Sequence, residues 1–278
     1  MTSVPTIALN NGVEIPQLGF GVFQIKPAET AKATATALEI GYRHIDTAQM
    51  YGNEREVGQA VRESGIDRGD IFVTSKLNNN RLEHDDILKA FDATMEALGF
   101  DYLDLFLVHW PLPAVADVVA RWKAMEQIYA TGRVRAIGVS NHHTNHLNAI
   151  FDQTEIKPAV NQIEVSPFLT QEELRAFNAE HEIVTEAWSP IARGKVAEDA
   201  VIADIGEQHG KSPAQVTLRW HIQRGDVVFP KSVTRSRVED NFAIFDFELD
   251  EGQMAAISAL DRSERTGPNP DEFNYVPS

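Results

Sequence analysis

The stretch DDILKAFDATMEALGFDYLDLFLVHW, residues 85–110, combines one helical pattern and one strand pattern. Along its first half an apolar stripe recurs at spacings of three and four, formed by Leu88, Phe91, Met95 and Leu98. Its last part, LDLFLVHW at 103–110, is almost continuously apolar, as strands buried on both faces of a parallel sheet usually are. The stretch therefore predicts a helix that is followed by a buried parallel strand.

The same unit recurs along the whole chain. Apolar runs followed by a polar loop and an amphipathic segment occur at 18–23, 44–48, 71–76, 103–110, 135–141, 159–165, 183–188 and 227–232. Eight strands that alternate with helices predict a (β/α)8 TIM barrel. We expect a single domain over residues 1–278, with an N-terminal β-hairpin at 7–15 as a cap, an extra C-terminal helix at 250–260 and a tail.

A doubly wound open sheet is the alternative fold, and it normally carries a glycine-rich phosphate loop after its first strand. In GFGVFQ, residues 19–24, Gln24 stands where the third glycine is required. HGKS at 209–212 imitates the end of a P-loop, but Ile205 occupies the position of its first glycine. Because both phosphate-loop patterns are incomplete, the barrel is favoured.

Composition excludes several classes of function. The chain has no cysteine, which rules out disulfides and thiolate chemistry, and a net charge of -16, which repels nucleic acid. No stretch approaches the roughly 20 apolar residues of a membrane span, and MTSVPTIALNNG lacks the regions of a secretory signal. We expect a cytoplasmic monomer, since no exposed apolar seam is evident, with no nucleic-acid or membrane partner.

Four side chains suited to proton transfer lie at or just after neighbouring strand ends, where barrel enzymes place their active sites: Asp46, Tyr51, Lys76 and His109. A free tyrosine, with a pKa of about 10, is a weak acid at neutral pH, and a nearby ammonium lowers that pKa. A carboxylate keeps the lysine charged, and a histidine can orient a carbonyl oxygen. The set predicts reduction of a carbonyl, in which hydride reaches carbon and a proton reaches oxygen.

A basic cluster stands out from the acidic chain. PKSVTRSRVEDN, residues 230–241, places Lys231, Arg235 and Arg237 after the eighth strand and at the start of a helix. This is the usual phosphate site of a barrel, so we expect it to bind the phosphates of a hydride-carrying cofactor. The alternative is a solvated turn, balanced by Glu239 and Asp240.

Several motifs, in this order, resemble the aldo-keto reductase superfamily over nearly the whole chain. They are GYRHIDTAQMYGNEREVG at 41–58, TSKL at 74–77, VHWP at 108–111, IGVSN at 137–141, AVNQIE at 159–164 and FPKSVTRSRVEDN at 229–241. The compact loops and HGKSPAQVTLRWHIQRG at 209–225 are most similar to the bacterial 2,5-diketo-D-gluconate reductase group. The resemblance implies NADPH-dependent reduction of aldehydes or ketones, such as keto-sugar acids or small α-dicarbonyls.

The resemblance also implies roles for individual residues. The catalytic tetrad is Asp46, Tyr51, Lys76 and His109, with Tyr51 as the general acid. Ser140, Asn141 and Gln162 hold the nicotinamide carboxamide, and Trp188 stacks on the nicotinamide ring. The other contacts to NADPH fall to Val22, Ser189, Lys231, Ser232, Val233, Thr234, Arg237, Asp240 and Asn241. The resemblance places Ser189 at the pyrophosphate and Asp240 and Asn241 at the adenine. It implies that the adenosine 2′-phosphate is held by Lys231, Ser232, Thr234 and Arg237, which favours NADPH over NADH.

The implied substrate contacts are Phe23, Tyr51, Asn78, His109 and Trp110. Two positions depart from the family pattern, because Asn78 replaces a frequent tryptophan and Ser166 replaces a histidine before proline. We expect a wetter and wider pocket as a result. The tail TGPNPDEFNYVPS, 266–278, is expected to fold over the site and to place Phe273 or Tyr275 near the substrate.

Three other functions remain open at the level of sequence. A barrel of this kind could bind NADPH as a sensor with little turnover. Asp46 and Glu164 could form the carboxylate pair of a glycoside hydrolase, although this leaves Lys76 and Tyr51 unexplained. His142 and His146 have metal-ligand spacing, but no third ligand is evident, so we expect no metal site.

Overall fold

The structure, a computed structural model, describes residues 4–277, so residues 1–3 and 278 of the predicted domain lie outside it. Its central sheet has eight parallel strands that follow one another in chain order. They are β3 (Phe20–Gly21), β4 (His44–Asp46), β5 (Phe72–Leu77), β6 (Leu103–Val108), β7 (Val134–Ser140), β8 (Val160–Glu164), β9 (Val184–Trp188) and β10 (Val227–Val228).

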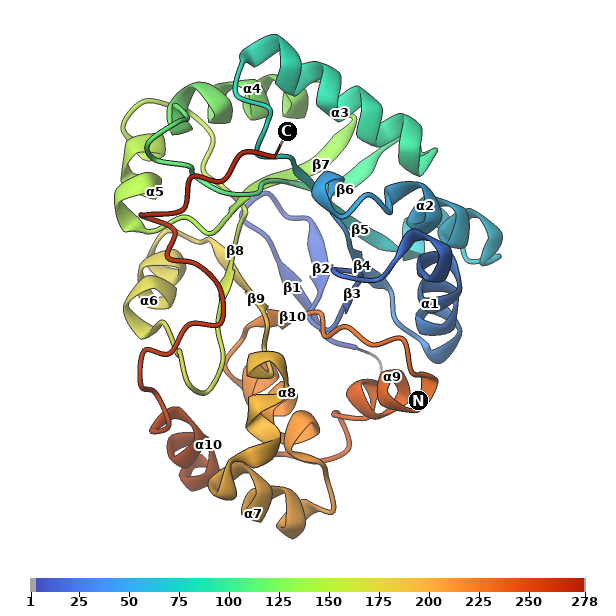
Figure 1. Cartoon of the computed structure of the whole chain (residues 1–278), viewed down its shortest axis with the longest axis vertical. Helices are drawn as coiled ribbons and strands as arrows, with labels where there is room; N and C mark the ends of the chain where they lie inside the picture. The colour runs from blue at the N-terminus through green and yellow to red at the C-terminus, as the bar shows by residue number, and fades with distance from the viewer. Residues whose placement is uncertain (1–3, 278) are drawn as a thin grey trace.

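The sheet closes on itself next to its two shortest strands. Leu18 forms a parallel bridge with Val228, and the Gly19 amide donates to the Val228 carbonyl over 2.7 Å. Figure 1 shows the strands arranged around a central axis with helices outside them. The predicted TIM barrel is therefore confirmed, with strands one or more residues shorter than most of the apolar runs that predicted them.

One helix follows each strand and covers the outside of the barrel. These helices are α1 (Pro27–Ile40), α2 (Glu54–Glu63), α3 (His84–Leu98), α4 (Val118–Ala130), α5 (Thr144–Phe151), α6 (Glu172–Glu180), α8 (Pro213–Gln223) and α9 (Arg235–Phe242). In α3 the predicted stripe is buried at Phe91, Met95 and Leu98, whereas Leu88 is only half-buried and Ile87 takes the inner position. The buried face of α3 is therefore shifted slightly from the predicted stripe, so that Ile87 rather than Leu88 faces the barrel.

The N-terminal hairpin closes the end of the barrel opposite the site. It consists of β1 (Thr6–Ala8) and β2 (Glu14–Pro16), paired antiparallel. Buried Leu9 and Ile15 belong to one apolar cluster with Phe72 and Val227. These two are the first residues of β5 and β10. The hairpin therefore covers the N-terminal ends of the strands and leaves their C-terminal ends uncovered by it.

Two helices stand outside the eight repeats and cover one side of α8. They are α7 (Ala200–His209) and α10 (Glu251–Ser258), and both pack on α8 around the buried Trp220. The sequence predicted α10 but not α7. Three short 3-10 helices complete the chain: η1 (Gln49–Tyr51), η2 (Arg68–Asp70) and η3 (Ala192–Glu198). Within residues 4–277 no helix is both long and apolar enough to cross a membrane.

A close approach between α2 and the end of α3 depends on a glycine. A Cβ atom added to Gly58 would lie 2.1 Å from the Leu98 carbonyl oxygen, far inside contact distance.

Gly58→Ala should therefore lower the free energy of unfolding by about 1–3 kcal/mol through overpacking, although alanine is the better helix former. Urea denaturation measures this. Gly69→Ala is the control, because nothing lies near that Cβ position; equal effects of the two changes would contradict the packing argument.

Candidate active site

The four predicted catalytic side chains meet at the C-terminal end of the barrel. Lys76 Nζ donates hydrogen bonds to both carboxylate oxygens of Asp46, over 2.7 and 2.8 Å. It also donates to the Tyr51 hydroxyl over 3.3 Å. The His109 ring lies edge-on to the Tyr51 ring, with 5.9 Å between the ring centroids. Lys76 therefore links the carboxylate to the phenol.

Buried amide side chains fix the loop that carries Tyr51. Asn53 Nδ2 donates to the carbonyl of Val22 over 3.1 Å, which ties this loop to the end of β3. Gln49 Oε1 accepts from the backbone amide of Asn78 over 2.8 Å, which ties it to the end of β5. These two hydrogen bonds hold the loop of Tyr51 next to the strand ends that carry the predicted site residues Val22 and Asn78.

Burial controls the protonation of these groups. Desolvation by itself would lower the pKa of Lys76. The charges and hydrogen bonds of Asp46 and Tyr51 outweigh this effect, so the pKa is raised and Lys76 stays protonated. Burial raises the pKa of Tyr51, and the Lys76 ammonium opposes that rise. The sequence predicted a phenol pKa below its ordinary value, and the net direction in the structure is the opposite because the phenol is desolvated. Tyr51 consequently holds its proton at neutral pH.

The His109 imidazole is neutral. Burial, followed by the positive charges of Lys76 and Arg121, holds the pKa of His109 well below its ordinary value. A neutral ring can donate one hydrogen bond to a carbonyl oxygen without adding a charge to the site. This agrees with the orienting role that the sequence analysis gave to His109.

A second polar layer adjoins the tetrad, and the sequence analysis missed half of it. Gln162 on β8 donates from Nε2 to Asp46 Oδ2 over 2.9 Å and to Glu186 Oε2 over 2.6 Å. Glu186 is buried on β9, in register with Gln162. Burial, reinforced by the Asp46 charge, raises the pKa of Glu186 to about 8. An acidic residue inside the apolar run IVTEAW, two positions before Trp188, was the available signal.

The other residues predicted to hold the nicotinamide end lie together at the ends of β7 and β9. Ser140 Oγ donates to the Gln162 carbonyl over 2.8 Å. Asn141 Nδ2 donates to the His109 carbonyl over 3.0 Å, and Asn141 Oδ1 accepts from Trp188 Nε1 over 2.8 Å. These bonds fix the Trp188 indole beside the tetrad, but they also occupy the polar groups of Ser140 and Asn141.

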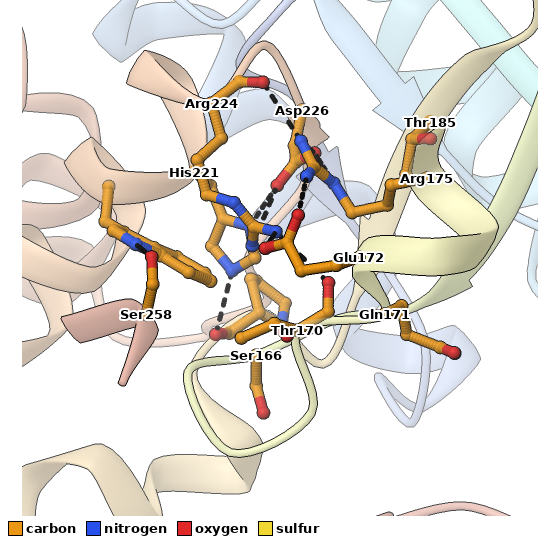
Figure 2. Close-up of polar contacts among 12 residues, drawn as sticks. Ser166, Thr170, Gln171, Glu172, Arg175, Thr185, His221, Arg224, Asp226 and Ser258 are labelled. Atoms are coloured by element: carbon orange, nitrogen blue, oxygen red, sulfur yellow. Dashed lines mark hydrogen bonds and ion pairs between the residues drawn. The ribbon is translucent and has the colours of Figure 1, made fainter. Parts of the chain in front are cut away.

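A buried polar cluster fixes the loop after β9 from outside the barrel, as Figure 2 shows. The His221 ring is 2.8 Å from Asp226 Oδ2 through Nδ1 and 3.2 Å from the Pro190 carbonyl through Nε2. Arg175 also donates to Asp226, over 2.8 Å. Ser189, directly before Pro190, has a φ of 50°, which is strained for serine. The anchored loop holds Ser189 in this conformation at the predicted phosphate site.

The three basic residues of the predicted phosphate site differ in their partners. Arg235 pairs with Glu39 and Glu239, each over 2.9 Å. Lys231 and Arg237 form no ion pair with any residue between 4 and 277. Arg235 therefore belongs to surface ion pairs. Lys231 and Arg237 remain to bind an anionic ligand, in a chain of net charge -16.

The turn before α9 adds backbone donors to these cations. Ser232 Oγ accepts from the Thr234 amide over 3.1 Å, and Val233 is exposed between them. Among the described residues no side chain caps the first turn of α9, so its N–H groups are available to an anion. Asp240 and Asn241, predicted to contact adenine, lie in the second half of the same helix.

Aromatic side chains surround the phenol on the substrate side. The Phe23 ring lies 5.0 Å from the Tyr51 ring, and Phe273 of the tail packs on Trp110 with 4.2 Å between centroids. The tail thus reaches the site, as predicted, through Phe273. Asn78 Oδ1 is buried and accepts no hydrogen bond from the described residues. Asn78 therefore leaves a buried acceptor without a partner among the described residues, at the position where the family often has tryptophan.

Ser166, the second departure from the family pattern, lies in a tight turn after β8. Its Oγ accepts from the Phe168 amide over 3.3 Å, and its backbone pairs with Leu169 in a tight turn. The side chain is buried. Ser166 therefore shapes the loop after β8, and its bonds give no support to a widened pocket.

Glu164 and the histidines after β7 hold the tail. Glu164 accepts from the Thr266 and Gly267 amides, and a Cβ atom on Gly267 would lie 2.4 Å from the Trp188 ring. His143 Nδ1 lies 2.7 Å from Asp271 Oδ2. Among residues 4–277 no group of three or more His, Cys, Asp or Glu side chains could hold a metal ion. Glu164 is thus engaged by the tail, which argues against its use as a glycosidase carboxylate.

Comparison with known proteins agrees with this geometry. The sequence model of the aldo/keto reductase family matches residues 17–262. The chain belongs to the aldo/keto reductase family. It is 43% identical over 275 residues to methylglyoxal reductase DkgA of Escherichia coli K12, covering 98% of this chain and 99% of that protein. It is 46% identical over 271 residues to glyoxal reductase of Bacillus subtilis 168, covering 97% and 98%.

Among solved structures, a point mutant of Gox0644 in complex with NADPH matches with a TM-score of 0.94. The two sequences are 40% identical, and the match covers 99% of this chain and 100% of that one. As a member of this family the chain is an NADP-dependent oxidoreductase that reduces carbonyl groups. Its own residues fit the cofactor, because Lys231 and Arg237 form no ion pair within residues 4–277, and none of these residues caps the start of α9 beside them with its side chain.

The buried Glu186 carboxyl gives the protein a pH dependence that can be measured. Between its ordinary pKa of 4.5 and about 8, the unfolded chain has released this proton while the folded chain retains it. Rising pH in this range therefore lowers the free energy of unfolding, and Glu186→Gln removes the effect. We expect the variant to gain stability over the wild-type chain from pH 5 to pH 8, with a plateau above. Urea denaturation across this range tests it; a constant difference would refute a neutral Glu186.

Proposed function

We propose that Tyr51 is the general acid that protonates the carbonyl oxygen of the substrate. The contact of Lys76 with both Asp46 and Tyr51 carries this assignment. Asp46 holds Lys76 in its charged form, and the Lys76 ammonium stabilises the phenolate left when the proton is given up. The neutral His109 ring orients the carbonyl oxygen toward the phenol.

We assign the cofactor to the residues that surround this centre. NADPH, when bound, supplies the hydride for the carbonyl carbon. Trp188 offers its face and Gln162 an amide for the nicotinamide end, next to Ser140, Asn141 and Val22. We assign the phosphates to the anchored Ser189 loop and to Lys231, Ser232, Val233, Thr234 and Arg237, in the turn before α9 and in its first turn. We assign the adenine to Asp240 and Asn241, in the second half of α9.

Small α-dicarbonyls are the substrate class that we favour. The relatives named above are a methylglyoxal reductase and a glyoxal reductase. Phe23 and Trp110 provide apolar walls, while Asn78 places a polar side chain where the family often has tryptophan. A polar wall also suits keto-sugar acids such as 2,5-diketo-D-gluconate, which makes them the second candidate.

A sensor barrel with little turnover is disfavoured. The relatives are named as reductases, and the chain keeps all four side chains of the proposed tetrad in contact. We also propose that residues 1–278 act as one domain, since the tail at 266–277 contacts residues of the loops after β6, β7 and β8.

Tyr51→Phe tests the general acid. Loss of the hydroxyl should lower kcat for methylglyoxal by about 100-fold or more, because the proton donor is gone. The Kd for NADPH, followed by quenching of Trp188 fluorescence, should stay unchanged. Tyr129→Phe, on the outer helix α4, is the matched control and should keep full activity. Wild-type turnover in Tyr51→Phe would disprove the mechanism.

Arg237→Met tests the 2′-phosphate contact. The free guanidinium should account for a 10- to 100-fold rise in the KM for NADPH, since charge-assisted bonds to phosphate are strong, while the KM for NADH changes little. Arg235→Met is the matched control and should leave both KM values within about twofold, because exposed ion pairs hold that side chain. Equal loss of affinity for both cofactors in Arg237→Met would remove this role.

A further inference from the structure

Gln162 is the one residue of the proposed carboxamide site whose amide faces two carboxyl groups at once. Its Nε2 donates to Asp46 Oδ2 and to Glu186 Oε2, so both of its N–H groups are used inside the barrel. Its Oε1 accepts no hydrogen bond from the residues that the structure describes. The amide oxygen is therefore the part of Gln162 that remains for a ligand.

Glu186 lacks the partners that normally keep an acid in a protein core. It is fully buried, and its Oε1 accepts no hydrogen bond within residues 4–277. The nearest imidazole nitrogen, His44 Nε2, is 4.0 Å away and already bonds Thr74 over 3.1 Å. Branched apolar residues usually fill such barrel positions, and a buried carboxyl without partners is costly. The Gln162 amide is the one hydrogen-bond donor to Glu186 among the described residues.

The two carboxyl groups together fix the orientation of the Gln162 side-chain amide. A bond to Asp46 alone would leave the amide free to swing about that contact. A second bond to Glu186, from the neighbouring strand, fixes the plane of the amide. The reversed amide is excluded by the Asp46 carboxylate, because the amide oxygen would then face a charged acceptor 2.9 Å away with no proton between them.

We propose that Glu186 is a positioning residue for the cofactor, which holds Gln162 with its Oε1 directed at the carboxamide N–H2 of the nicotinamide. The proposal rests on the proposed function, since it takes Gln162 as a cofactor contact. Glu186 acts only through Gln162, so its effect belongs to the nicotinamide end of NADPH and not to the adenosine end.

Glu186→Met tests the proposal, because it keeps the side chain's length and removes the acceptor. The Kd for NADPH, measured by Trp188 fluorescence, should rise about tenfold, as expected for one lost hydrogen bond in a buried site. The affinity for 2′-AMP, measured by calorimetry, should stay at the wild-type value. Glu186→Gln, whose amide oxygen can still accept from Gln162, should restore the NADPH affinity to within about twofold.

Gln162→Met and the double variant show whether the two residues act as one unit. If Glu186 works through Gln162, the double variant should bind NADPH no more weakly than Gln162→Met alone. Additive losses, or wild-type NADPH affinity in Glu186→Met, would overturn the proposal. Unchanged affinity in Gln162→Met would instead refute the proposed cofactor role of Gln162. Glu186→Leu, a residue type usual inside barrels, replaces Glu186→Met if that variant does not fold, with the same expected outcomes.

Discussion

The buried ion pair between Lys76 and Asp46 is the interaction on which the site depends. Two charges in a desolvated barrel are stable only together, because burial of either one alone is strongly unfavourable. The pair is bidentate, at 2.7 and 2.8 Å, and Lys76 Nζ also lies 2.9 Å from the Thr47 carbonyl and 3.3 Å from the Tyr51 hydroxyl. The same geometry that makes the charges tolerable thus places an ammonium beside the phenol.

The rest of the site is arranged around this pair by the barrel itself. Parallel strands bring inward-facing residues of β4, β5, β8 and β9 into neighbouring layers, so Asp46, Lys76, Gln162 and Glu186 form one continuous polar network. Its charges balance when Glu186 holds a proton, since one ammonium then faces one carboxylate. The barrel interior can carry such a network because each member bonds the next.

Loops beyond the strands are fixed by contacts that are remote in sequence. The tail is tied down by Glu164 and His143, and the loop after β9 by His221 on α8. Figure 2 shows the polar cluster around His221, Asp226 and Arg175, from which His221 Nε2 contacts the Pro190 carbonyl over 3.2 Å. These remote contacts hold the loops in one conformation. Ser189 and Asn141, at the edge of the site, can therefore retain a positive φ that would otherwise be unfavourable.

The sequence by itself determined the barrel and predicted the four residues of the proposed tetrad. Strand burial leaves near-continuous apolar runs, and polar residues at their ends are conspicuous in one dimension. Only the tertiary structure decided which polar groups bond one another. Glu186 next to Gln162, Arg235 paired with Glu39, and Ser166 in a turn depend on strand register and helix placement, which no local pattern encodes. The net direction of the Tyr51 pKa likewise depends on burial, and burial is a property of the folded chain alone.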